Sequence, residues 1–133
     1  MVHWSFGLAW LAFALALALH TADEARHDFL SLYNANVRAI RRRFHVPVPV
    51  FTFPVWLGGL VGAVCLLLLL SPLAFHGTHW IRVAALLLGA LIGIGNGLWH
   101  IAASLVCRRK MPRVLSSPVL LATGAWLLLS CWT

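Results

Sequence analysis

Acidic residues are the scarcest charged groups in this sequence. Its 133 residues include only three, and all of them lie within residues 23–28: Asp23, Glu24 and Asp28. Charged residues make up 10% of the chain and apolar residues 62%, whereas soluble proteins are about 45–50% apolar even with glycine counted. A chain this apolar cannot cover itself with polar surface in water, so we expect a lipid bilayer to be its solvent. A disordered chain and a soluble nucleic-acid-binding domain are excluded.

Cysteines are also few, and none of the three stands in a CxxC or Cys/His spacing. This excludes a disulfide-framed secreted domain and gives no sign of a cysteine zinc site. The chain also contains no GxSxG motif, no P-loop and no GxGxxG motif after a strand. Histidines, carboxylates and amides are therefore the side chains that remain as candidates for chemistry.

Four apolar stretches are long enough, or nearly so, to cross a hydrocarbon core of about 30 Å as helices of about 20 residues. They cover about residues 4–24, 54–73, 80–107 and 114–132. The predicted fold class is all-α: a polytopic membrane protein in which residues 1–133 form one domain, a four-transmembrane-helix bundle. The first stretch also resembles a signal peptide, but its beginning has His3 and no Lys or Arg, which favours a retained helix.

Basic residues gather in the first and third connections between these spans. The first connection contains Arg38, Arg41, Arg42 and Arg43, and the third contains Arg108, Arg109, Lys110 and Arg113. Because basic loops stay on the cytoplasmic side, we predict an integral protein of the cytoplasmic membrane with both termini outside. We expect no nucleic-acid partner, because no soluble surface with interleaved aromatic residues accompanies the arginines.

The segment after the first span has an amphipathic pattern. Apolar residues recur there every three or four positions: Leu30, Tyr33, Val37, Ile40 and Phe44. This spacing predicts a short interfacial helix that either continues out of the membrane or bends onto its inner surface. The following residues 46–50 alternate valine with proline and are predicted to be extended.

Glycines spaced four residues apart occur in the second and third spans, at Gly58 and Gly62 and at Gly89, Gly93 and Gly97. In lipid, small residues at this spacing let two helix backbones approach closely. We therefore expect both glycine faces to pack against other helices.

The acidic residues belong to a column of titratable groups. On a helix, His20, Glu24 and His27 fall within about 60° of one another, and Asp23 flanks them. Ser31 and Asn34 are expected to continue this stripe.

A second polar column lies in the third span, where Asn96 and His100 are four residues apart. Gly89 and Gly93 fall within about 60° of them on a helix, so His100 is expected to face the interior of the bundle. Its depth, about 12 Å from the basic segment that follows, is comparable with that of His20. We expect the two columns to meet.

Ionisable groups inside a membrane are costly and mark functional sites by default. Imidazoles and carboxylates are ligands for zinc, iron or manganese, and the ExxH spacing of Glu24 and His27 supplies two ligands from one helix in di-iron bundles. The predicted ligands of a divalent metal are His20, Glu24, His27 and His100. Asp23, Glu24 and Asn96 are the predicted catalytic residues.

The same residues have a structural interpretation. His20 and Glu24 can form a simple ion pair, residues 23–28 can form a solvated turn beside the membrane, and Asn96 and His100 can hydrogen-bond neighbouring helices. It is the matching column on another span that favours a functional site.

At these residues the sequence resembles the HXXEE-domain family of small bacterial integral membrane proteins. The resemblance rests on His20-Thr-Ala-Asp23-Glu24 and Asn96-Gly-Leu-Trp-His100, and it continues through Arg108-Arg-Lys-Met-Pro112 to the last span. It covers essentially the whole chain. Asp23 stands where the family name has its first glutamate, which keeps the charge but shortens the reach. The resemblance implies about four helices and a site at His20, Asp23, Glu24, Asn96 and His100, whereas His27 comes from spacing alone.

The leading functional hypothesis is a membrane-embedded, metal-dependent enzyme of hydrolase, isomerase or cyclase type. Its expected partners are the lipid bilayer and a lipophilic small-molecule substrate near the cytoplasmic leaflet. One alternative is a small proton or metal-ion transporter, for which a chain of this size would have to form a homo-oligomer. Another is a structural or accessory subunit that docks a partner helix.

Overall fold

The computed structural model describes residues 2–106 and 116–132, and its regular structure in these ranges is entirely helical. The elements are α1 (Trp4–Arg26), α2 (Phe29–Phe44), α3 (Phe53–Leu69), α4 (Ser71–Phe75), α5 (His79–Leu88), the π-helical segment η1 (Gly89–Asn96), α6 (Gly97–Val106) and α7 (Ser117–Ser130). The predicted all-α class is confirmed. The basic segment 108–113, Cys107 and the predicted start of the fourth span at residue 114 lie outside the described residues.

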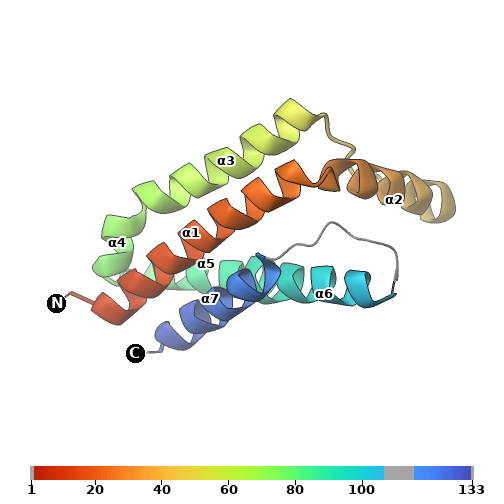
Figure 1. Ribbon diagram of the computed structural model, residues 1–133. Coiled ribbons are helices and arrows are strands. Elements are labelled where there is room, and N and C mark those ends of the chain that lie inside the picture. Colours follow the sequence, from red (N-terminus) through yellow and green to blue (C-terminus); the bar gives the residue numbers. More distant parts are fainter. Residues whose placement is uncertain (1, 107–115, 133) are drawn as a thin grey trace.

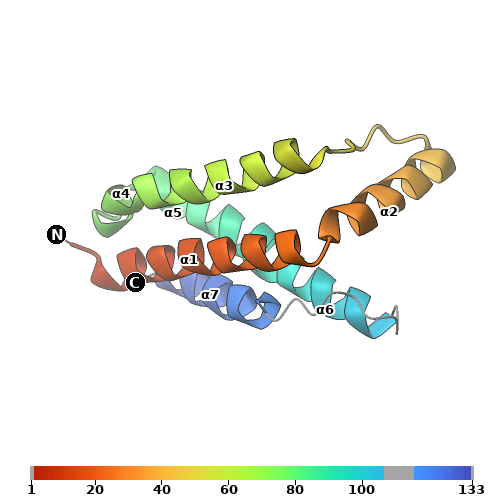
Figure 2. The same ribbon diagram turned by 45° about the horizontal axis from the view of Figure 1, so that its top comes forward.

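The helices run up and down along a common direction, and the two ends of the chain lie at the same end of the molecule (Figures 1 and 2). Helix α1 packs against α3 and α4 and also against α7, while η1 and α6 lie along α7. Helix α2 projects beyond the bundle at the end opposite the termini (Figures 1 and 2). This arrangement makes α1 and α7 the central pair.

Two helical stretches of the described chain are long and apolar enough to cross a membrane. They are α1, with 23 residues, and the continuous helical stretch His79–Ala102, with 24 residues. An 18-residue window in each has a mean hydropathy of 1.6 and 1.8, respectively. The other two apolar helices are shorter, with 17 residues in Phe53–Leu69 and 14 in Ser117–Ser130. By length and composition, two of the four predicted spans thus reach membrane-crossing size.

The apolar core is built around α1. Its buried apolar residues pack with others from α3, α5 and α7, and the largest of these side chains are Phe6, Trp10, Phe13, Leu17, Leu67, Ile81, Leu120 and Leu127. The indole Nε1 of Trp10 donates a 2.8 Å hydrogen bond to the carbonyl of Leu67, which ties α1 to α3. The hydrogen bond satisfies the one polar group of that buried ring.

The chain bends between α1 and α2. Helix α1 ends at Arg26, and Asp28 adopts a left-handed conformation with φ of 54°, which a non-glycine residue rarely adopts and which stops a helix. A short helix follows, as its apolar spacing predicts. The polar stripe does not continue, because Ser31 donates to Asp28 Oδ1 at 2.7 Å and Asn34 forms two hydrogen bonds with the backbone of Phe51.

The glycines of η1 and α7 allow a close crossing of two helices. A Cβ placed on Gly93 would lie 2.7 Å from the Cα of Gly124, and a Cβ on Gly89 would lie 3.1 Å from the Gly124 carbonyl oxygen. Close packing of the third span through its glycines is therefore confirmed. For Gly58 and Gly62 the expectation is not met, since no atom of the described chain lies within 4 Å of a Cβ placed on either.

We predict that Gly93→Ala destabilises the protein by about 1–3 kcal/mol, because the new methyl group collides with the backbone of α7, which cannot rotate away. Gly62→Ala is the matched control. Its methyl group meets open space, and alanine favours a helix over glycine by about 1 kcal/mol. Thermal unfolding in detergent, followed by tryptophan fluorescence, measures both. Equal midpoints in the two variants would contradict the close crossing.

Candidate metal centre

The carboxylate of Glu24 lies between two imidazoles in the interior of the bundle. Its Oε1 is 3.2 Å from Nε2 of His20, one turn earlier on α1, and 3.0 Å from Nε2 of His100 on α6. The exposed fractions of His20, Glu24 and His100 are 2%, 5% and 3%. The two polar columns predicted from the sequence therefore meet.

These three residues form the group that we call the His/Glu/His cluster. One nitrogen or oxygen atom from each of His20, Glu24 and His100 lies within 4.8 Å of the others. Glu24 and His100 are more than seventy residues apart in the sequence, and they meet because α1 and the stretch η1–α6 both pack against α7. Two imidazoles and a carboxylate are ligands typical of zinc and of iron.

His100 is the cluster residue whose ring nitrogens lack aligned hydrogen-bond partners among the described residues. Its Nε2 approaches Glu24 Oε1 closely, but the contact lacks the alignment of a hydrogen bond, and Nδ1 has no hydrogen-bond partner among the described residues. The ring lies between two others, with centroids 5.0 Å from those of His20 and Phe29. A buried imidazole without an aligned partner is costly, so this ring is available to a ligand of its own.

Asn96 is the last residue of η1, and its side-chain amide contacts the imidazole of His20. Its Nδ2 donates a hydrogen bond of 3.1 Å to His20 Nε2, the same nitrogen that faces Glu24. The π-helical turns end at this residue. Such turns are rare and are frequently found at functional sites.

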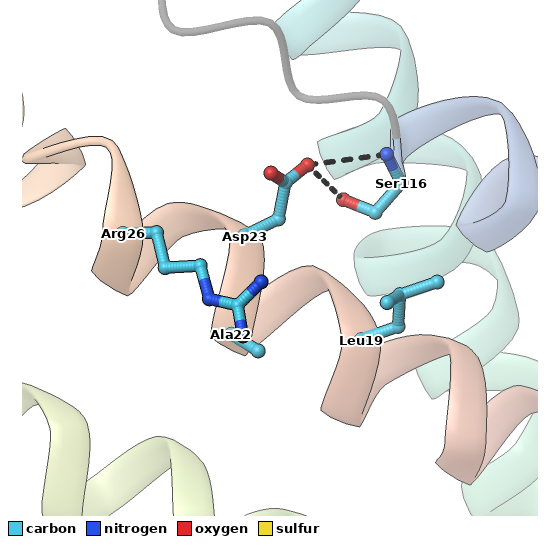
Figure 3. Close-up of a pocket in the computed structure, with 5 residues that line it drawn as sticks. All are labelled: Leu19, Ala22, Asp23, Arg26 and Ser116. Atoms are coloured by element: carbon cyan, nitrogen blue, oxygen red, sulfur yellow. Dashed lines mark hydrogen bonds between the residues drawn. The ribbon is translucent and has the colours of Figure 1, made fainter.

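Asp23 connects α1 to the beginning of α7 through hydrogen bonds with Ser116. Its Oδ2 accepts hydrogen bonds from the Ser116 backbone N–H at 3.2 Å and from the Ser116 hydroxyl at 2.9 Å (Figure 3). The same hydroxyl oxygen is 3.0 Å from Nδ1 of His20. Asp23 is thus linked to the His/Glu/His cluster through Ser116.

The structure does not bring His27 to the cluster. Because α1 ends at Arg26, His27 leaves the face that carries Glu24, and its half-exposed ring donates from Nδ1 to the carbonyl oxygen of Asp23 at 2.8 Å. Nδ1 also lies 3.1 Å from Asp23 Oδ1. The ExxH spacing holds its geometry only inside a helix, and the helix stops one residue too early.

Ser116 is the residue of the site that the sequence does not indicate. It lies just before α7 and is buried, and a serine at that place is ordinarily a helix cap. Here its side chain makes no capping bond to its own helix and bonds to α1 instead. The available signal is its position two residues before Pro118 at a helix start, which predicts a helix cap rather than a contact with a histidine.

A small open pocket of about 190 Å³ lies outside this link, lined by Leu19, Ala22, Asp23, Arg26 and Ser116 (Figure 3). Pockets that hold small-molecule ligands usually measure about 300–1,000 Å³. None of the three cluster residues lines it. We therefore place no substrate there.

Comparisons of the chain with protein-family models, with curated proteins and with solved structures found no match. The function of the site is therefore argued from its own geometry.

We predict that Asp23→Ala lowers the free energy of unfolding by about 1–3 kcal/mol, because it removes the acceptor of two Ser116 donors where α7 begins. His27→Ala removes only a half-exposed contact of the same carboxylate and should stay within about 0.5 kcal/mol. Thermal unfolding in detergent compares them. If both variants lose the same stability, Asp23 does not act through Ser116.

Proposed function

We propose that this chain is a membrane-embedded, metal-dependent enzyme acting on a lipophilic substrate. The observation that carries the proposal is the convergence of His20, Glu24 and His100 in a buried site where His100 lacks an aligned hydrogen-bond partner. Three protein ligands with one position open is the arrangement of catalytic zinc sites, whereas structural zinc sites are closed by four.

The two distances from Glu24 to the histidines fit a small divalent cation. Neighbouring ligands of a tetrahedral ion with bonds of about 2.0–2.1 Å lie about 3.3 Å apart, close to the 3.2 Å and 3.0 Å from Glu24 Oε1 to the two histidines. A cation would also offset the cost of burying a carboxylate in the membrane. His20, Glu24 and His100 would hold it, and it would supply Lewis-acid polarisation of a substrate oxygen.

The protein residues have separate tasks in a reaction of hydrolase, isomerase or cyclase type. Both histidine contacts fall on Oε1 of Glu24, so its Oε2 is the proton acceptor for general-base catalysis. The Asn96 amide, which points at the cluster, donates a hydrogen bond to an oxygen that gains negative charge. Asp23 faces Ser116 rather than the cluster, so we assign it a positioning role.

An enzyme is favoured over an ion conduit by what surrounds the site. The buried side chains of α1 between Phe6 and Leu17 are all apolar, a distance of about 16 Å along the helix. Among the described residues, the buried ionisable groups apart from Cys131 are the three cluster residues alone. A conduit for ions needs ionisable or polar groups along its length. In the described core, the buried ionisable groups other than Cys131 lie only at one end, and the buried polar groups toward the other end are the hydroxyls of Ser71 and Ser130.

The walls of the site suit an apolar substrate. The Phe29 ring lies 5.0 Å from His100 and 6.4 Å from Trp56, so aromatic side chains of α2 and α3 stand on one side of the cluster. Helix α2 carries an apolar face and four arginines, a composition typical of helices that lie at a membrane surface. We infer that the site opens toward the cytoplasmic leaflet.

We further propose that all four apolar helices cross the cytoplasmic membrane with both termini outside. The up-and-down arrangement supports this, because the termini and the arginines of α2 lie at opposite ends (Figure 1). Membership of the HXXEE-domain family is likewise a proposal. Its support is that the two motifs, which are far apart in sequence, meet at His20 and Asn96.

Metal content tests the enzyme proposal. Protein purified in detergent should contain about one equivalent of zinc, iron or manganese by elemental analysis, and Glu24→Gln and His100→Ala should lose it while remaining folded. His27→Ala, which removes a histidine outside the cluster, should retain it. Absence of metal from wild-type protein that also fails to bind added Zn²⁺ would refute the proposal.

Cysteine labelling tests the topology. In a background lacking the three native cysteines, His76→Cys lies in the turn between α4 and α5, and an impermeant thiol reagent should label it on intact cells. Arg42→Cys on α2 should react only after the membrane is permeabilised. The reverse pattern would contradict the proposed orientation and leave the metal proposal untouched.

A further inference from the structure

Four polar residues around His20 determine where its proton lies. Ser116 has one hydroxyl proton, and the carboxylate of Asp23 accepts it at 2.9 Å. The Ser116 oxygen therefore acts as an acceptor toward Nδ1 of His20, 3.0 Å away. This direction of donation requires a proton on Nδ1.

The other nitrogen of His20 is fixed by Asn96. The Nδ2 of Asn96 can only donate, and it lies 3.1 Å from His20 Nε2, so Nε2 presents its lone pair. The hydrogen-bond pattern therefore places the ring proton on Nδ1 and leaves Nε2 as the acceptor. Its Nε2 also lies 3.2 Å from Oε1 of Glu24, so a cation bound beside Glu24 would take the lone pair that accepts the Asn96 hydrogen bond in this structure.

We propose that Ser116 and Asp23 are positioning residues that hold His20 in the Nδ1–H tautomer and so make Nε2 its metal-binding nitrogen. This inference rests on the proposed metal-dependent function. Histidines that bind metals generally donate their second N–H to a carboxylate or carbonyl oxygen, which fixes the ring and raises its basicity. Here the carboxylate is Asp23, and it acts through the hydroxyl of Ser116.

The local structure of α7 supports this role. Ser116 is buried just before the helix, where a serine side chain usually caps its own backbone, a bond whose loss costs about 0.5–2 kcal/mol. Its hydroxyl instead bonds to α1. The next residue, Ser117, is also buried, yet its hydroxyl has no hydrogen-bond partner among the described residues. The two adjacent serines are both buried, and of the two it is Ser116 that is connected to Asp23 and His20.

Nitrogen NMR of histidine-labelled protein in detergent tests the tautomer directly. The His20 signals, assigned by their loss in His20→Asn, should show a protonated Nδ1 both before and after Zn²⁺ is added, and Nε2 should shift when Zn²⁺ binds. A proton on Nε2 in the metal-free wild-type protein would overturn the proposal without the need for any variant.

Zinc affinity tests the positioning role. Ser116→Ala should weaken Zn²⁺ binding about 10- to 100-fold, the loss typical when a supporting residue behind a metal ligand is removed. Ser116→Thr, which keeps the hydroxyl, should restore most of it. Ser117→Ala is the matched control and should bind Zn²⁺ as the wild type does. Equal affinity in Ser116→Ala and Ser117→Ala would also overturn the proposal.

The two proposals fail in different ways. If the purified wild type contains no metal and binds no added Zn²⁺, the metal-dependent function fails, even where Nδ1 of His20 carries its proton. If Zn²⁺ binds to the cluster but Ser116→Ala changes neither the affinity nor the nitrogen shifts, the function stands and the positioning role is wrong. Asp23→Asn provides a second variant, because it weakens the acceptor of the Ser116 hydroxyl while keeping its shape.

Discussion

The buried carboxylate of Glu24 constrains the placement of the helices around it. A carboxylate in an apolar interior needs compensating partners, and here the partners come from its own helix and from α6. Helix α6 must therefore present His100 at the depth of Glu24, which fixes the position of α6 along α1. Helix α7 must in turn begin where Ser116 can reach His20 and Asp23.

The glycine crossing makes this arrangement sterically accessible. Gly93 and Gly124 bring η1 and α7 so close that neither position has room for a side chain. The same packing sets Ser116, eight residues before Gly124, beside α1. The close packing of η1 and α7 in the middle of the bundle thus also helps to set the position of Ser116 relative to α1 in the polar site.

Helical periodicity was enough to predict the helices and the two polar columns. Residues four apart share a face, so Glu24 could be paired with His20, and Asn96 with His100, before any tertiary information was available. The end of α1 could not be predicted in this way, because Arg26 and His27 continue the helical pattern and the left-handed Asp28 leaves no distinctive sequence signal. Because α1 ends at Arg26, His27 lies outside the helix and is separated from the cluster.

The role of Ser116 was unpredictable for a different reason. Its partners are more than ninety residues away, and no local rule connects a serine before a proline-containing helix start with a histidine on the first helix. The packing of Gly58 and Gly62 was overpredicted, since small residues at this spacing permit a close approach but do not supply a neighbour. In both cases the missing information was which helices lie side by side.

The π-helical segment has a consequence for how this chain tolerates changes in length. Turns with an extra residue shift the angular phase of a helix, so α5 and α6 point their side chains in directions that depend on the eight residues between them. Loss of one residue within Gly89–Asn96 would tighten a turn and rotate His100 away from Glu24 while leaving the composition of both halves intact. The π-helical segment thus sets the rotation of α6, which carries His100, relative to α5, which packs in the core.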